Sequence, residues 1–225
     1  MQVRLLVLSL VFFSLQSFSQ PFRWNDVSLI MQGAGYHSTI LNPQYYTEEI
    51  DGVTPTLRFS GGVGLMYNFT ENWAVSLTTD YQRKGQRFER YMRGETVTRD
   101  YKIDYLDVNL MGKYFTDRYV FGLGGYAGFL VREELRFKHD VMLGTQNFFN
   151  ANRYNDLDYG LQAEVGVLLD LDYRTKATLS LFAMYGLSDI NNERFQVDLL
   201  GEEYNPARNF IVGLRFTVYI ITQPF

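Results

Sequence analysis

The sequence predicts an all-β fold, an eight-stranded antiparallel up-and-down barrel, on the basis of three observations. Eight segments alternate apolar with polar or small residues at a period of two, and no segment shows a convincing helical period. The connections between these segments are alternately short and long, as in barrels whose two rims differ. Aromatic residues make up 16% of the chain although its mean hydropathy is only −0.17, which favours strands with two chemically different faces.

The first twenty residues have the features of a targeting segment rather than of a folded element. Arg4 precedes an apolar run over 5–15, and small serines stand three residues and one residue before a cut expected ahead of Gln20. At ~1.5 Å per residue this run covers roughly 17 Å, too little for a helix to cross a bilayer. We therefore expect 1–19 to be a signal peptide and 20–225 to form one barrel domain.

Each predicted strand has one apolar face and one face of polar or small residues. In the sixth strand, for example, Leu161 and Val165 alternate with Gln162 and Glu164. Such alternation is typical of an antiparallel sheet with different surroundings on its two sides. The expected strands cover residues 27–37, 57–67, 73–84, 102–114, 119–137, 157–169, 177–187 and 209–221.

The connections indicate which rim faces which compartment. The short ones are 68–72, 115–118 and 170–176, and the long polar ones are 38–56, 85–101, 138–156 and 188–208. Outer-membrane barrels have short periplasmic turns and long extracellular loops. An even number of strands also brings both ends of the barrel to the rim of the short turns.

Aromatic residues favour a transmembrane barrel over a soluble lipocalin-like barrel, which would keep its apolar face inside. They gather at both ends of the predicted strands, as expected where a barrel crosses two membrane interfaces. The expected periplasmic belt contains Tyr67, Phe69, Trp73, Tyr114, Phe115, Tyr119, Tyr173 and Tyr219. The expected outer belt contains Tyr36, Tyr81, Tyr105, Phe129, Tyr159 and Tyr185.

Glycines and the last strand favour the same fold. Small residues suit the interior of an eight-stranded barrel, which has room only for side chains. The spacing of Gly213, Phe216 and Val218 before Phe225 is like the assembly signal of outer-membrane barrels, so we expect the barrel-assembly machinery to act on this chain. The glycines expected on the inward face are Gly33, Gly35, Gly62, Gly64, Gly122, Gly124, Gly128, Gly160, Gly166 and Gly213.

Short motifs in the last six predicted strands resemble the PorT family of small outer-membrane β-barrel proteins from Bacteroidota. They are Tyr-Gln-Arg-Lys-Gly at 81–85, Ile-Asp-Tyr-Leu-Asp-Val-Asn at 103–109, Gly-Gly-Tyr-Ala-Gly-Phe-Leu at 124–130, Asp-Tyr-Gly at 158–160, Tyr-Gly-Leu-Ser-Asp-Ile at 185–190 and the segment 209–216. The resemblance implies an outer-membrane β-barrel of a Gram-negative bacterium. It also implies a link to type IX secretion, and it transfers no catalytic residue.

The inward face carries charges that we expect to pair, because an unpaired charge in a tight lumen is costly. Glu164 and Arg215, both in the middle of strands, are expected to form one pair. Asp80, Lys84, Asp107 and Arg132 are expected to form a network nearer the loops. The whole expected lumen network is Asp80, Lys84, Asp107, Lys113, Arg132, Glu134, Glu164 and Arg215.

Three functions remain open on the sequence. The favoured one is a structural or interaction role with the lumen filled by these side chains, and the second is a narrow ion-conducting pore. The third is an outer-membrane enzyme acting on lipid at the rim, where His37 and His139 are the only histidines. We favour a non-enzyme with no catalytic, cofactor or metal site, because neither an EF-hand loop nor a phosphate-binding loop is present.

The long loops are the expected place of contact with other molecules, since loops on a rigid scaffold often carry recognition. Arg87, Arg90, Arg93 and Arg99 are expected to face the phosphates of lipopolysaccharide. Expected partners are outer-membrane lipid, lipopolysaccharide, and proteins of the envelope or of a secretion complex. A formal net charge of −4 argues against a nucleic-acid partner, which requires a basic face.

Overall fold

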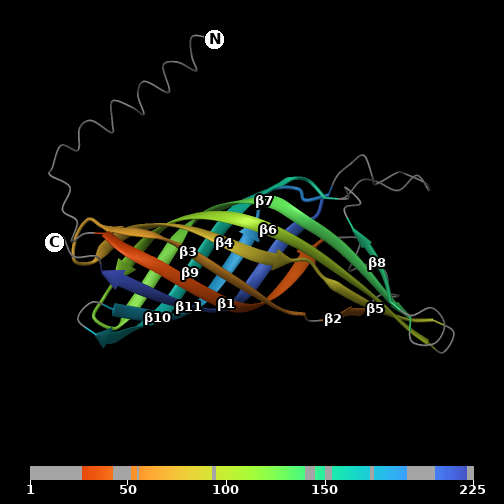
Figure 1. Cartoon of the computed structure of the whole chain (residues 1–225), viewed down its shortest axis with the longest axis horizontal. Coiled ribbons are helices and arrows are strands. Elements are labelled where there is room, and N and C mark those ends of the chain that lie inside the picture. The colour runs from red at the N-terminus through yellow and green to blue at the C-terminus, as the bar shows by residue number, and fades with distance from the viewer. Residues whose placement is uncertain are drawn as a thin grey trace, which may run out of the picture.

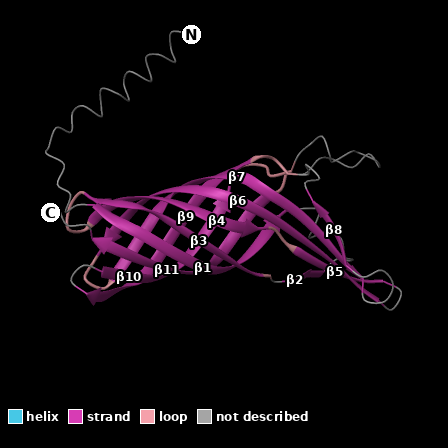
Figure 2. Ribbon diagram, in the orientation of Figure 1, coloured by secondary structure: helices cyan, strands magenta, loops and turns pink. Residues whose placement is uncertain are grey.

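The computed structural model describes residues 27–42, 52–54, 56–92, 95–139, 145–149, 154–172, 175–191 and 206–221. Eight long strands form a barrel, and three short strands extend from one of its ends (Figures 1 and 2). The barrel strands are β1 (Val27–Leu41), β3 (Leu57–Asn68), β4 (Trp73–Lys84), β6 (Glu95–Phe115), β7 (Tyr119–His139), β9 (Leu157–Asp172), β10 (Thr175–Gly186) and β11 (Arg208–Ile221). The short strands are β2 (Gly52–Thr54), β5 (Arg87–Met92) and β8 (Thr145–Phe149).

The barrel closes because each long strand pairs antiparallel with the next, and the last returns to the first. β1 pairs with β11 from Ser28 opposite Ile221 to Leu41 opposite Arg208. In hydrocarbon an unpaired N–H or C=O has no water to bind, so only a closed ring of strands satisfies the backbone. The predicted eight-stranded up-and-down barrel is confirmed. No helix among the described residues is long and apolar enough to cross a bilayer.

Strand β6 begins at Glu95, seven residues before its predicted start at 102, and β7 ends at His139, two residues after its predicted end at 137. The two strands pair as far as Val97 opposite His139. β5 continues the sheet beside β6, β2 pairs with β5, and β8 pairs with β7. The sequence predicted that 85–101 and 138–156 are long loops, but parts of both connections are strands. Outside the hydrocarbon neither face of a strand has to be apolar, so the alternation that marked the spanning segments is missing there.

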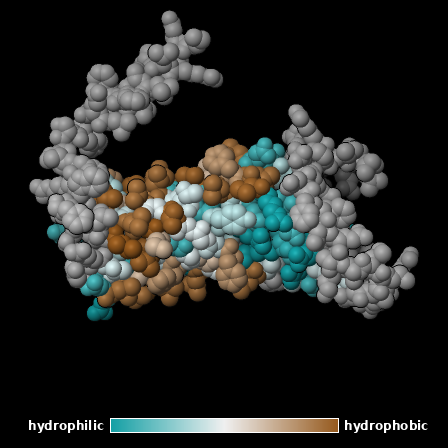
Figure 3. All heavy atoms as spheres, in the orientation of Figure 1, coloured by the Kyte–Doolittle hydropathy of each residue, from teal (hydrophilic) through white to brown (hydrophobic). Residues whose placement is uncertain are grey.

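The large apolar side chains point away from the barrel axis, and the polar ones point toward it. Leu77, Leu110 and Leu161 are exposed on the outer wall, whereas their strand neighbours are buried. Apolar residues gather on the barrel wall in Figure 3, and hydrophilic residues gather toward the end that carries β5 and β8. A soluble barrel would show the opposite distribution.

The faces predicted for some aromatic and glycine residues are wrong. Tyr36, Tyr105 and Tyr219, expected in the aromatic belts, are buried in the lumen. Gly33 and Gly35, expected inside, lie on the outward-facing positions of β1. A large ring fits into a narrow barrel where the residue opposite is small, since interior side chains must fill the available space together.

Gly160 provides a test of the packing inside the barrel. A Cβ at this inward position would overlap the backbone oxygen of Tyr185 and lie 2.8 Å from Cε1 of Tyr126. Replacing Gly160 with Ala is therefore expected to lower the free energy of unfolding by about 1–3 kcal/mol, measured by urea titration in detergent micelles.

Gly33→Ala is the matched control, because a Cβ at this outward position meets nothing closer than 3.8 Å. Its effect is expected to stay within about 0.5 kcal/mol. Equal losses in the two variants would contradict the inward orientation of Gly160.

Candidate functional site

The outer half of the lumen is occupied by a buried lysine between two carboxylates. Lys84, at the end of β4, places Nζ 2.9 Å from Oδ2 of Asp107 and 2.9 Å from Oδ2 of Asp158. The same ammonium group lies 4.8 Å from the ring centroid of Tyr105 and 4.3 Å from that of Tyr126. Lys84 is fully buried, so its charge is balanced by these carboxylates and rings rather than by water.

A second charged cluster fills the inner half of the lumen around Glu164 of β9. Lys113 Nζ donates to Glu164 Oε1 over 2.6 Å and to the hydroxyl of Tyr219 over 3.0 Å. Arg215 Nη1 reaches Glu164 Oε2 at 3.1 Å, and its guanidinium carbon lies 4.3 Å from the ring centroid of Phe182. One carboxylate thus connects side chains from β6, β9 and β11 across the barrel.

Amide side chains occupy the lumen between the two clusters. Asp80 accepts hydrogen bonds from Gln32 Nε2 at 2.8 and 2.7 Å and from Asn109 Nδ2 at 2.7 Å. Gln162 Nε2 donates to Asn109 Oδ1 over 3.1 Å. Side chains from β1, β4, β6 and β9 therefore meet across the middle of the lumen, and hydrogen bonds offset the cost of burying the Asp80 carboxylate.

The structure brings most of the predicted lumen residues together inside the barrel. The Glu164–Arg215 pair has the partners that the sequence indicated, and Lys84 meets Asp107. Asp158 belongs to the Lys84 cluster but was absent from the predicted network. Asp158 stands on the polar face of the sixth predicted strand, two residues before Gly160, and this position could have indicated that it faces the lumen. The predicted residues found in the lumen are Asp80, Lys84, Asp107, Lys113, Glu164 and Arg215.

Arg132 and Glu134 were predicted in the lumen, and this prediction is wrong. Tyr105 pairs with Leu130 and Asp104 pairs with Arg132, so Val131 is an extra residue that forms a bulge in β7. A bulge shifts the alternation of the following residues by one position. Arg132 is consequently half exposed on the outer wall, and Glu134 lies on the same side beside its register partner Lys102.

The four arginines expected to face lipopolysaccharide do not form one surface among the described residues. Arg87 Nη2 lies 3.4 Å from Oδ2 of Asp100, which is paired with it in register. Arg99 is the neighbour of Asp100 along β6, and successive side chains of a strand point to opposite faces. The side chain of Arg90 and all of Arg93 lie outside the described residues.

His37 and its neighbour Ser38 at the outer rim do not form a nucleophile–base pair. His37 Nδ1 accepts a hydrogen bond from the backbone N–H of Thr56 at 3.1 Å. Ser38, the next residue of β1, accepts one from the N–H of Gly85 at 3.2 Å and points to the other face. The side chain of His139 lies outside the described residues. The described residues also hold no group of three or more His, Cys, Asp or Glu side chains placed to bind a metal ion.

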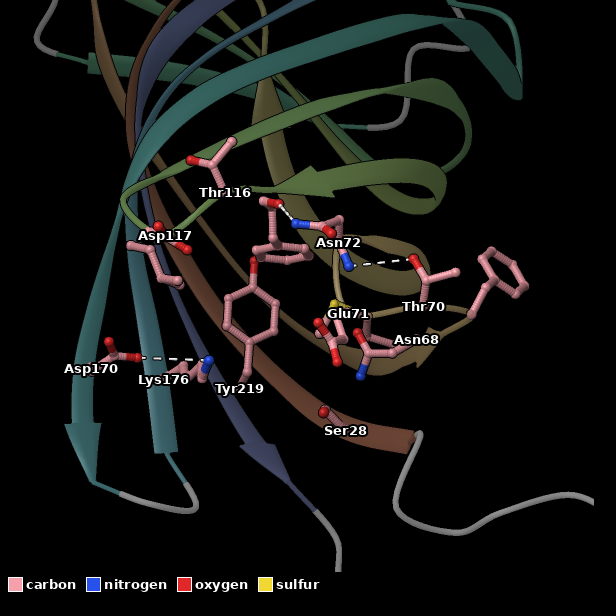
Figure 4. A pocket seen from close by; sticks show the side chains of 14 residues that line it. Ser28, Asn68, Thr70, Glu71, Asn72, Thr116, Asp117, Asp170, Lys176 and Tyr219 are labelled. Carbon is pink, nitrogen blue, oxygen red and sulfur yellow. Dashed lines mark hydrogen bonds and ion pairs between the residues drawn. The ribbon is translucent and has the colours of Figure 1, made fainter.

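At the rim of the short turns a cavity of about 830 Å³ opens toward the periplasm (Figure 4). Its wall includes Glu71, Asp117 and Asp170 from the turns and strand ends, together with Lys176. Tyr219 also lines the cavity, and its hydroxyl binds Lys113. The cavity therefore borders the Glu164 cluster, whose buried side chains occupy the lumen beyond it.

An apolar wall, a closed backbone and a polar filled interior define a transmembrane β-barrel of the outer membrane. The sequence matches the outer membrane protein beta-barrel domain family over residues 18–192. The chain belongs to this family, and its location is the outer membrane of a Gram-negative bacterium. No curated protein matches the sequence.

Several solved structures are similar to this chain. Neisserial surface protein A (NspA) is 12% identical with a TM-score of 0.44, over 87% of this chain and 99% of that one. OprG from Pseudomonas aeruginosa is 14% identical with a TM-score of 0.44, over 88% and 98%. The attachment invasion locus protein Ail of Yersinia pestis is 12% identical with a TM-score of 0.41, over 87% and 99%.

Substitution of Lys84 measures how much the lumen network contributes to the free energy of unfolding. Lys84→Met leaves Asp107 and Asp158 buried without their shared cation, so the free energy of unfolding is expected to fall by about 3–5 kcal/mol in urea titrations of the micelle-bound protein.

Lys176→Met is the control, because Lys176 Nζ lies 3.7 Å from Asp170 Oδ1 in a largely exposed pair. Loss of an exposed pair is expected to cost at most about 1 kcal/mol. Similar losses at the two positions would show that the lumen network contributes no more than a surface contact.

Proposed function

We propose that this protein is a non-enzymatic, non-conducting barrel that acts through the surfaces it presents outside the lumen. The observation that carries the proposal is the filling of the lumen by the Lys84 and Glu164 clusters, the amides between them and the rings of Tyr105, Tyr126 and Tyr219. An ion passing through would have to displace buried ion pairs. Breaking such a pair leaves an uncompensated charge, which is costly in a barrel of this size.

The extracellular extension supports a role in interaction. β6 and β7 each have 21 residues, whereas β3 and β4 each have 12. At ~3.3 Å per residue the longer strands cover roughly 70 Å, far more than a tilted strand needs to cross the hydrocarbon. Together with β2, β5 and β8 they present a paired sheet outside the membrane, which is a firmer platform for a partner than a loop.

The partner that we propose is a protein of the cell envelope, in an accessory role in type IX secretion or in envelope integrity. The support for this finer assignment is the resemblance of the motifs at 81–85, 103–109 and 124–130 to the PorT family. A narrow ion-conducting pore is the competing function, and a rim enzyme acting on lipid is the third.

Planar-bilayer recording separates a filled barrel from a pore. The purified protein is expected to give no steady, reproducible conductance steps. A variant with alanine in place of all six charged residues of the two clusters is expected to conduct, because the replacement removes the filling side chains and leaves the formal net charge unchanged. These residues are Lys84, Asp107, Asp158, Lys113, Glu164 and Arg215.

Folding of both proteins is checked by their heat-dependent migration in gels before recording. Reproducible steps from the unaltered protein would overturn the non-conducting function and favour the pore.

The accessory role predicts a stable envelope partner. Affinity purification from gently solubilised membranes, followed by mass spectrometry, is expected to recover subunits of the secretion pathway in fixed proportion to the barrel. An unrelated outer-membrane barrel with the same tag serves as the control. Recovery of this barrel alone would contradict the accessory role while leaving the filled lumen unaffected.

A further inference from the structure

On the outer wall of three neighbouring strands, apolar side chains give way to charged ones at one level. In β4 the exposed Tyr81 is followed on the same face by Arg83, and in β6 the exposed Leu106 is followed toward the outer rim by Asp104. In β7 the exposed Val131 is followed by Arg132. The register joins these positions, because Arg83 pairs with Asp104 and Asp104 pairs with Arg132. A change from apolar to charged residues along these three strands is the pattern expected at the outer boundary of the hydrocarbon.

Two carboxylates hold the cations of this wall in place. Asp104 accepts hydrogen bonds from Arg83 Nε at 2.6 Å and Nη2 at 2.9 Å, and from the hydroxyl of Tyr81 at 2.6 Å. Glu134 lies 3.3 Å from Lys102 Nζ, 3.5 Å from Arg132 Nη2 and 3.3 Å from Arg136 Nη2. Such contacts restrict the long side chains before any ligand binds, which lowers the entropic cost of binding.

The cations outnumber the carboxylates, and the three arginines are exposed on the wall whereas Lys102 is buried. Arg83, Lys102, Arg132 and Arg136 are four positive groups against Asp104 and Glu134, so these six residues carry a formal charge of +2. Asp100, the register partner of Arg136, is paired with Arg58 and Arg87. The side chains of Arg83, Arg132 and Arg136 are 36%, 49% and 47% exposed, whereas those of Asp104 and Glu134 are 2% and 9% exposed. An approaching ligand therefore meets guanidinium groups rather than carboxylates. We call this group of six residues the outer basic patch.

The basic charge is confined to one side of the barrel among the described residues. At the corresponding ends of β9 and β10 the outward residues are Tyr159, Tyr185 and Leu187, all exposed. Among the described residues on that side Arg208 of β11 is the exposed cation, its Nη1 donates to the hydroxyl of Tyr185 over 3.1 Å, and Asp156 stands exposed just before β9. A merely solvated rim would not concentrate its cations over three adjacent strands.

We propose that the outer basic patch binds the phosphate groups of a glycolipid in the outer leaflet. The guanidinium fork matches phosphate oxygens, and cations beside a membrane attract anionic headgroups. The patch stands directly above exposed apolar residues, so one ligand with phosphates above and acyl chains below matches both surfaces. Phe129 and Val131 provide that apolar surface on β7. The inference rests on the outer-membrane location and does not depend on whether the lumen conducts.

The test compares lipid binding by two charge-matched double variants in detergent micelles. The probe is bisphosphorylated lipid A, and dephosphorylated lipid A is the reference ligand. Arg132→Gln with Arg136→Gln is expected to weaken binding of the bisphosphorylated form by about thirtyfold, the effect of two cations next to an anionic headgroup. Arg118→Gln with Lys176→Gln removes the same charge at the periplasmic rim and is expected to leave the affinity unchanged.

A second variant separates lost charge from lost structure. Arg132→Lys with Arg136→Lys keeps the charge and is expected to retain most of the affinity, and the fold of every variant is checked by heat-dependent gel migration. Equal binding by the two glutamine variants, or equal binding of the two lipids by the unaltered protein, would overturn the proposal. Binding of poly-glutamate to the patch in preference to bisphosphorylated lipid A would also overturn it, because the patch would then be a docking face for an acidic protein.

Discussion

The requirement that every backbone N–H and C=O be bonded within the protein governs this structure. It forces strand β11 to pair with β1, and the closed ring of eight strands leaves an interior with room only for side chains. Polar residues on the inward face then have few partners other than one another. The Lys84 and Glu164 clusters follow from that confinement, since a charge left alone in so narrow a space would be far too costly.

The sequence predicted the fold well because the membrane imposes the alternation that a periodicity search detects. The predicted strand 73–84 coincides with β4, and Leu77 and Leu110 face outward as their positions indicated. Beyond the hydrocarbon this constraint ends, so the outer part of β6 and the short strands β5 and β8 were not recognised, although the prediction for β7 reached residue 137. A single bulge at Val131 likewise leaves no trace in the alternation, and it moved Arg132 and Glu134 to the outer wall.

The lumen could be predicted in composition but only partly in its contacts. Alternation shows that Asp80 faces inward. It cannot show that this carboxylate accepts hydrogen bonds from the amides of Gln32 and Asn109 instead of pairing with a lysine. That choice depends on the stagger of the strands around the barrel, which places residues of distant strands at the same height. With its interior filled, the barrel offers other molecules its wall and its rims. The two proposals place contact with other molecules on the outer basic patch and on the sheet around β5 and β8.

The orientation of the sheet and the filling of the lumen are tested most directly at two neighbouring residues of β4. The chain has no cysteine of its own. Ser76 is buried in the lumen and Leu77 is exposed on the wall, so each is replaced by cysteine and the folded protein in vesicles is treated with thiol reagents. The Ser76→Cys thiol is expected to resist both a water-soluble and a lipid-soluble maleimide, while the Leu77→Cys thiol is expected to react only with the lipid-soluble one. Rapid modification of Ser76→Cys from water would show an open lumen, and its modification from lipid would show that the faces of the sheet are reversed.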